Sequence, residues 1–134
     1  MITVQNTIKD AIDKVWEFWT TPEHIVKWNF PSEDWHTIQV ENDLRVGGKF
    51  KYTMAAKNGN TVFDFEGVYT RVETFSEIEY QLFDNRTGSV HFEASSDKVI
   101  LTEKFQPEAG NPEEMQQQWC QAVIDHFKDY VENN

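Results

Sequence analysis

Apolar and polar side chains alternate along about 75 residues after Pro31, and this alternation limits the possible folds more than any other pattern in the chain. Successive side chains of a β-strand point to opposite faces, so the alternation predicts strands with one buried and one solvated face. Short polar segments such as Asn58-Gly59-Asn60 divide the run, as the turns between antiparallel strands do. The predicted strands are Trp35–Glu41, Gly48–Ala55, Thr61–Val72, Ile78–Phe83, Ser89–Ala94 and Lys98–Phe105.

The segment before this run predicts one more strand and two short helices. Residues Ile2–Ile8 alternate and predict a first strand, which brings the sheet to about seven strands. Apolar residues at helical spacing predict a short helix at Ala11–Trp19. Thr21-Pro22 begins a second helix that runs to about Trp28, because proline is favoured at the first position of a helix.

The last predicted element is a long amphipathic helix. Pro107 and Pro112 end the sheet, and the helix extends from there to about Glu132 with apolar side chains on roughly half of its circumference. A curved antiparallel sheet that wraps around this helix buries two apolar faces that neither element could bury alone. We therefore predict an α+β helix-grip fold in a single domain over residues 1–134.

Composition argues against several functions. The formal net charge of −11 makes binding to nucleic acid or to an anionic membrane electrostatically unfavourable. No apolar run is long enough to span a bilayer and the first residues lack a signal-peptide pattern, so we expect a cytoplasmic protein. The single cysteine, Cys120, and four dispersed histidines predict neither a disulfide nor a metal site, and we expect no cofactor.

Several motifs, taken in their order and spacing over almost the whole chain, carry a family resemblance. They are Lys14-Val15-Trp16, Thr21-Pro22-Glu23, Trp28, Asp43-Leu44-Arg45-Val46-Gly47-Gly48-Lys49-Phe50, Gly67-Val68-Tyr69 and Trp119. The chain resembles the START-like (SRPBCC) superfamily, and within it the bacterial proteins similar to the C-terminal domain of the activator of the heat-shock-protein-90 ATPase. The resemblance implies a deep cavity between the sheet and the long helix, which other members use for lipids, sterols, polyketides and hormones. It implies no particular reaction.

Aromatic and apolar side chains on the faces that would meet predict the wall of this cavity. The predicted lining residues are Trp28, Phe50, Tyr52, Met54, Phe63, Phe65, Tyr80, Phe92, Phe105, Met115, Trp119, Val123 and His126. Arg45 is a candidate polar anchor at the cavity mouth, but the many carboxylates of the chain favour a structural ion pair as its role. The neighbouring Gly47-Gly48 pair precedes a strand, so we interpret it as a sharp bend and not as a phosphate-binding loop.

Three hypotheses for function follow from this arrangement. The first is binding of a small hydrophobic molecule, with a few polar side chains fixing its orientation. The second is a module that regulates a chaperone through the exposed sheet face or the segment from Trp28 to Trp35. The third is an enzyme of the cyclase or hydrolase type, in which a cavity carboxylate or histidine moves a proton.

The enzyme hypothesis requires a titratable group that points into the cavity and has a perturbed pKa. The candidate acids are Asp64, Glu66, Glu93 and Glu103, which lie in or beside predicted strands. Alternation with Phe63 and Phe65 places the first two on the solvated face.

Overall fold

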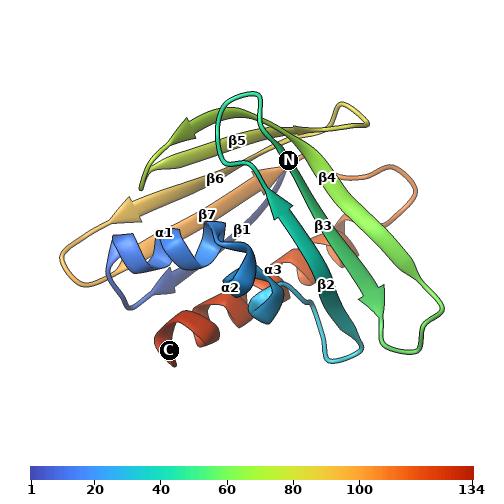
Figure 1. The fold of residues 1–134 in the computed structure, drawn as a ribbon, viewed down its shortest axis with the longest axis horizontal. Helices are drawn as coiled ribbons and strands as arrows, with labels where there is room; N and C mark the ends of the chain where they lie inside the picture. Colours follow the sequence, from blue (N-terminus) through green and yellow to red (C-terminus); the bar gives the residue numbers. More distant parts are fainter.

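The computed structural model describes residues 1–134 and confirms the predicted α+β helix-grip fold (Figure 1). Each element begins and ends within two residues of its predicted position, because prolines, glycines and short polar turns mark the limits. The elements are β1 (Ile2–Ile8), α1 (Ile12–Thr20), α2 (Pro22–Trp28), β2 (Trp35–Asn42), β3 (Lys49–Ala56), β4 (Val62–Glu73), β5 (Glu77–Leu82), β6 (Thr87–Ala94), β7 (Val99–Phe105) and α3 (Glu113–Glu132).

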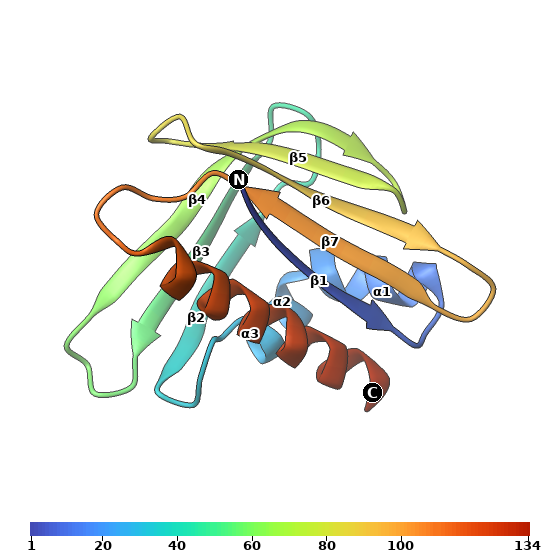
Figure 2. The ribbon, with the colours of Figure 1, turned by 180° about the vertical axis from the view of Figure 1, so that it is seen from behind.

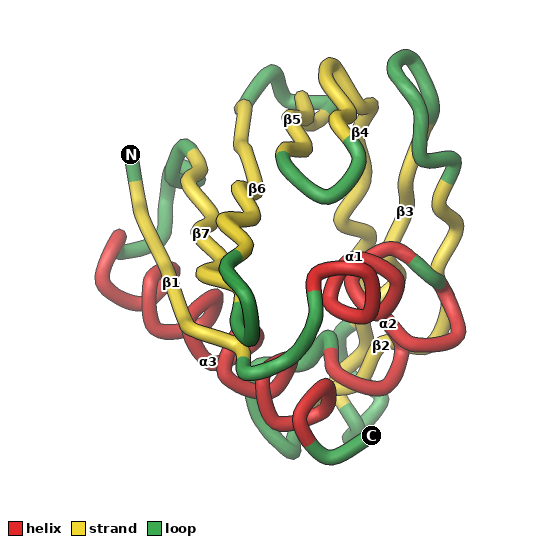
Figure 3. Tube along the Cα trace, turned by 90° about the vertical axis from the view of Figure 1, so that its left-hand side faces the viewer, coloured by secondary structure: helices red, strands yellow, loops and turns green.

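All seven strands form one antiparallel sheet in the order β1-β7-β6-β5-β4-β3-β2, so β1 and β2 lie at its two edges. The register shifts between Thr37 and Gln39 in β2 and between Tyr69 and Arg71 in β4. Such β-bulges increase the local twist and bend a strand. The sheet is accordingly strongly curved, and the helices lie across its open side (Figure 3).

The long helix α3 crosses the concave side of the sheet and passes close to β1 (Figure 2). The second half of the helix carries its fully buried side chains, Ile124, Phe127 and Val131. The ring of Phe127 packs against Trp19 and Trp28, with ring centroids 5.0 and 4.7 Å apart. The C-terminal half of α3 is therefore the part that anchors the helix to the core.

The two short helices close the concave interior near this end. Trp19 of α1 and Trp28 of α2 stack with their ring centroids 4.7 Å apart, and Trp28 donates its indole N–H to the carbonyl oxygen of Phe18 at 2.9 Å. Trp28 is only 1% exposed. None of the helices is both long enough and apolar enough to cross a membrane.

Candidate functional site

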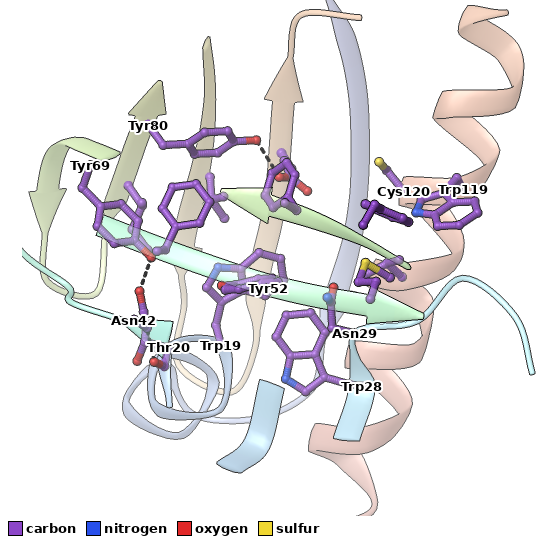
Figure 4. Close-up of a pocket in the computed structure, with 18 residues that line it drawn as sticks. Trp19, Thr20, Trp28, Asn29, Asn42, Tyr52, Tyr69, Tyr80, Trp119 and Cys120 are labelled. Atoms are coloured by element: carbon purple, nitrogen blue, oxygen red, sulfur yellow. Dashed lines mark hydrogen bonds between the residues drawn. The ribbon is translucent and has the colours of Figure 1, made fainter. Parts of the chain in front are cut away.

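A cavity of about 140 Å³ lies between the first half of α3, the two short helices and the concave face of the sheet (Figure 4). Fourteen of its eighteen lining residues are hydrophobic. The cavity forms because α3 packs tightly only through its second half, which leaves space beneath its first half. The lining residues are Trp19, Thr20, Trp28, Asn29, Asn42, Phe50, Tyr52, Met54, Phe63, Phe65, Tyr69, Ile78, Tyr80, Val90, Glu103, Trp119, Cys120 and Val123.

The structure brings together nine of the residues that the sequence places on the cavity wall. They come from α2, from the adjacent strands β3, β4 and β5, and from α3, whose inward faces meet across the cavity. These nine are Trp28, Phe50, Tyr52, Met54, Phe63, Phe65, Tyr80, Trp119 and Val123.

Two predicted phenylalanines lie on the concave face but outside the cavity. Phe92 is the next inward-facing residue of β6 after the lining residue Val90. The rings of Trp16 and Trp19 cover Phe92 there, at centroid distances of 5.1 and 6.3 Å. Phe105 is the last residue of β7, opposite Ile2 of the edge strand β1, and packs on the margin of the core. Both side chains fill the core, so neither can contact a molecule in the cavity.

Two predicted residues of α3 also lie elsewhere. Met115 is 50% exposed, because the first turn of the helix lies outside the packed core. His126 stacks on Phe30 with ring centroids 4.2 Å apart, and its Nδ1–H donates to the carbonyl oxygen of Phe30 at 2.6 Å. The sequence prediction for these two positions is wrong, since spacing along a helix gives the direction of a side chain but not the depth to which it is buried.

Arg45 is an exposed ion-pair partner. Its Nε lies 2.9 Å from Oδ2 of Asp43, and the residue is absent from the cavity wall. The adjacent Gly47 has a φ of 83°, and its N–H donates to the carbonyl oxygen of Tyr69 at 2.8 Å. The glycine pair therefore makes the bend that attaches this turn to β4, as the sequence interpretation expects.

The cavity meets solvent between β4 and α3. Phe63, which is 37% exposed, and the partly exposed Trp119 both line the cavity. The ring of Trp35 contacts both, with centroids 5.6 Å from Phe63 and 5.2 Å from Trp119. We call these three rings the mouth cluster, because Phe63 and Trp119 line the cavity and also contact solvent, and Trp35 packs on both of them.

Glu103 of β7 is the one charged residue on the cavity wall. The hydroxyl group of Tyr80 donates to its Oε2 at 3.0 Å (Figure 4). Tyr80 lies in β5, two strands away from β7, and its ring passes over Gly88 in the intervening strand β6. A Cβ at position 88 would overlap the ring, so this glycine permits the contact between Tyr80 and Glu103.

Desolvation dominates the electrostatics of Glu103. Residue Glu103 is partly exposed, but the surrounding protein removes most of the hydration of its carboxylate and raises its pKa from 4.5 to about 7. The hydrogen bond from Tyr80 opposes part of this increase. Burial also raises the pKa of Tyr52, Tyr80 and Cys120, with the charge of Glu103 adding to the effect. Glu103 is thus the cavity group that changes its charge near neutral pH.

The other candidate acids lie away from the cavity. Asp64 is on the outer face of β4, where it accepts a hydrogen bond from the Thr53 hydroxyl at 2.7 Å, and Glu93 is exposed. Glu66 is partly exposed and absent from the cavity wall. No group of three or more His, Cys, Asp or Glu side chains gathers as a metal-binding cluster.

The opposite end of the cavity is closed by a short hydrogen-bonded chain. The hydroxyl of Tyr69 donates to Oδ1 of Asn42, and Nδ2 of Asn42 donates to the carbonyl oxygen of Thr20 at 2.7 Å (Figure 4). These bonds connect β4, the end of β2 and the last residue of α1. Burial raises the pKa of Tyr69, so its hydroxyl stays protonated and this series of hydrogen bonds carries no charge over the ordinary pH range.

The predicted wall leaves out nine lining residues. One of them, Glu103, is named from the sequence as a candidate acid, and it could also have been placed on the wall, because Val99, Leu101 and Phe105 share its face and the acid breaks an otherwise apolar series. The two asparagines carry no such signal, because each lies just after a helix or at a strand end. The omitted residues are Trp19, Thr20, Asn29, Asn42, Tyr69, Ile78, Val90, Glu103 and Cys120.

Comparisons with known proteins agree with the fold. The model of the family "Activator of Hsp90 ATPase homolog 1-like protein" matches residues 10–132. The solution structure of an AHSA1-like protein from Aeromonas hydrophila is 36% identical, with a TM-score of 0.88, and the match covers 98% of this chain and 93% of that one. The solution structure of a protein from Cytophaga hutchinsonii is 47% identical, with a TM-score of 0.85 and coverage of 99% and 92%. A search of curated proteins found no match.

Proposed function

Because the chain belongs to the Activator of Hsp90 ATPase homolog 1-like family and contains an apolar cavity, we propose that it binds a small, largely apolar molecule there. The observation that carries this proposal is the mainly hydrophobic wall of a cavity that meets solvent at the mouth cluster. Binding sites for small molecules are typically concave and apolar with a few polar groups.

The size of the cavity limits its occupant. A volume of about 140 Å³ holds on the order of ten non-hydrogen atoms. This is a single aromatic ring with a short side chain, and it is much smaller than a sterol or a membrane lipid. The aromatic side chains that surround the space favour a flat, polarisable ligand.

Energetics also favour occupation by a ligand. The cavity meets solvent, so its apolar wall is in contact with water. A ligand that replaces this water gains roughly 25 cal/mol for each Å² of apolar surface that it buries. It also gains dispersion contacts with the rings.

Thermal unfolding with indole and 2-phenylethanol tests the proposal. A ligand at about 100 times its Kd stabilises the protein by about 2.7 kcal/mol, which raises Tm by roughly 10 °C for a chain of this length. Val123→Trp fills the cavity and should abolish the increase. Gln118→Trp adds the same side chain to an exposed position of α3 and should leave the increase unchanged. Equal binding by the two variants, or no increase with either ligand, would contradict the proposal.

Glu103 favours a second candidate function, proton transfer on a bound substrate. A carboxylate with a pKa of about 7 can both accept and return a proton at neutral pH. With a ketone in the cavity, Glu103 would take a proton from the carbon next to the carbonyl, giving the enolate, and then return a solvent-derived proton to that carbon. In D2O, NMR would show catalysed loss of the α-proton signals of 4-phenyl-2-butanone, and Glu103→Gln would prevent it. Exchange that continues in this variant would refute the role.

The chaperone hypothesis draws on the description of the family. In the segment from Trp28 to Trp35, Trp28 is buried and Trp35 is partly exposed in the mouth cluster. A chaperone contact through this segment or through the exposed sheet face stays a prediction. Ligand binding and proton transfer are the two functions that we propose for the cavity.

A further inference from the structure

Glu103 has no cationic partner in the protein. The lining residues include no Lys, Arg or His, and none of the ion pairs in the molecule involves Glu103. Its only hydrogen bond comes from Tyr80 and engages Oε2, so Oε1 is free to accept a further bond from the cavity side. A desolvated carboxylate is costly unless it is paired or protonated, and no cation of this chain is placed to pair with it.

The rings around Glu103 form a setting that suits a cation. Tyr80 and its neighbours Phe50 and Phe65 pack with ring centroids 5.7 and 6.1 Å apart, and Tyr52 lies 6.0 Å from Phe65. These four rings line the cavity together with Glu103. The faces of aromatic rings attract ammonium groups, most strongly where water is excluded.

We propose that the ligand of this cavity is a small aromatic or aliphatic amine, whose ammonium group pairs with Glu103 while its hydrocarbon part fills the aromatic space. The inference rests on the proposed ligand-binding function and names the chemical class of the ligand. An anionic ligand is disfavoured because its charge would face Glu103 in a poorly hydrated site. The net charge of −11 also favours the approach of cations over anions.

The proposed pairing predicts a dependence on pH. The titratable groups that face Glu103 are Tyr80 from β5, Tyr52 from β3 and Cys120 from α3, and burial keeps all three neutral near pH 7. Glu103 is therefore the one group of the four that titrates near pH 7. Amine binding should strengthen as pH rises and the carboxyl group of Glu103 loses its proton, and it should weaken again at the higher pH at which the amine loses its own proton.

Isothermal titration calorimetry with three ligands of similar size tests the inference. The ligands are 2-phenylethylamine, the neutral 2-phenylethanol and the anionic phenylacetate. At about pH 8 the wild-type protein should bind the amine at least about tenfold more tightly than the alcohol, as expected for a charge-assisted hydrogen bond. Phenylacetate should bind most weakly, and the preference for the amine should shrink at about pH 6.

Matched variants separate the role of Glu103 from a general effect of charge. Glu103→Gln should weaken amine binding at least about tenfold and alcohol binding much less, and the alcohol binding that is retained also shows that the variant is folded. Glu93→Gln makes the same change at an exposed position and should alter neither affinity. If the alcohol binds as tightly as the amine, or if Glu103→Gln leaves the amine affinity unchanged, the amine assignment is wrong while ligand binding stands. If none of the three ligands binds, both the assignment and the proposed function are wrong.

Discussion

Replacing Glu103 with glutamine should change how the stability of the protein depends on pH. The folded state raises the pKa of this carboxyl group from 4.5 to about 7. Between these values the folded protein holds one more proton than the unfolded chain, so its free energy of unfolding falls by about 1.4 kcal/mol per pH unit as pH rises. The stabilising effect of the protonated group is complete below pH 4.5 and is lost once the pH has passed through 7.

Urea denaturation between about pH 5.5 and 8.5 measures this effect and avoids the isoelectric point near 4.7, where low net charge promotes precipitation. Over that interval the deprotonation of Glu103 should lower the free energy of unfolding of the wild-type protein by about 2 kcal/mol, whereas a glutamine side chain does not titrate. The difference between wild type and Glu103→Gln cancels the contributions of all other groups and should change by this amount. Glu93→Gln, which removes a carboxylate at an exposed position, is the matched control. A difference for Glu103→Gln that is constant with pH would show that the carboxylate is well hydrated, and the desolvation argument would be refuted.

Three further predictions concern the residues around the cavity. Gly88→Ala should reduce the free energy of unfolding by about 1–3 kcal/mol in urea denaturation, because the added methyl group meets the ring of Tyr80, and the cost should largely disappear in a Tyr80→Leu background. Phe127→Ala removes a fully buried ring that packs on two tryptophans and should cost about 3–5 kcal/mol in the same assay; a cost below about 1 kcal/mol would mean that α3 is not anchored there. Because burial raises the pKa of Cys120, its thiol should react with iodoacetamide at about pH 8 at least about 100-fold more slowly than free cysteine, and urea should restore the rate.

Local patterns were sufficient to predict the fold. Strand alternation and helical spacing identify the apolar face of each element, and turn residues mark its ends, so each element could be located to within two residues. The curvature that the helix needs arises from bulges in β2 and β4 and from the packing of α3. These features depend on contacts between distant segments.

The cavity could be predicted only in part, because a sequence pattern tells which face of an element a side chain lies on but not how deeply that side chain is buried. Val90 and Phe92 occupy the same face of β6, yet the first lines the cavity and the second lies behind two tryptophans. Met115 and Trp119 share one face of α3, but only Trp119 reaches the sheet side of the cavity. Gly88 directly precedes the strand predicted at Ser89–Ala94, and its contact with Tyr80 depends on the pairing of β5 with β6.

The passage of Tyr80 across Gly88 has an evolutionary consequence. A phenol, a hydrogen at the α-carbon beneath it and an acid beyond it form one arrangement spread over β5, β6 and β7, in which the contact between the phenol and the acid requires the glycine. In relatives that bind a different kind of molecule, we expect all three positions to have changed together. A side chain larger than hydrogen at the position of Gly88 would then identify, from sequence alone, a relative whose cavity has lost this acid–phenol pair.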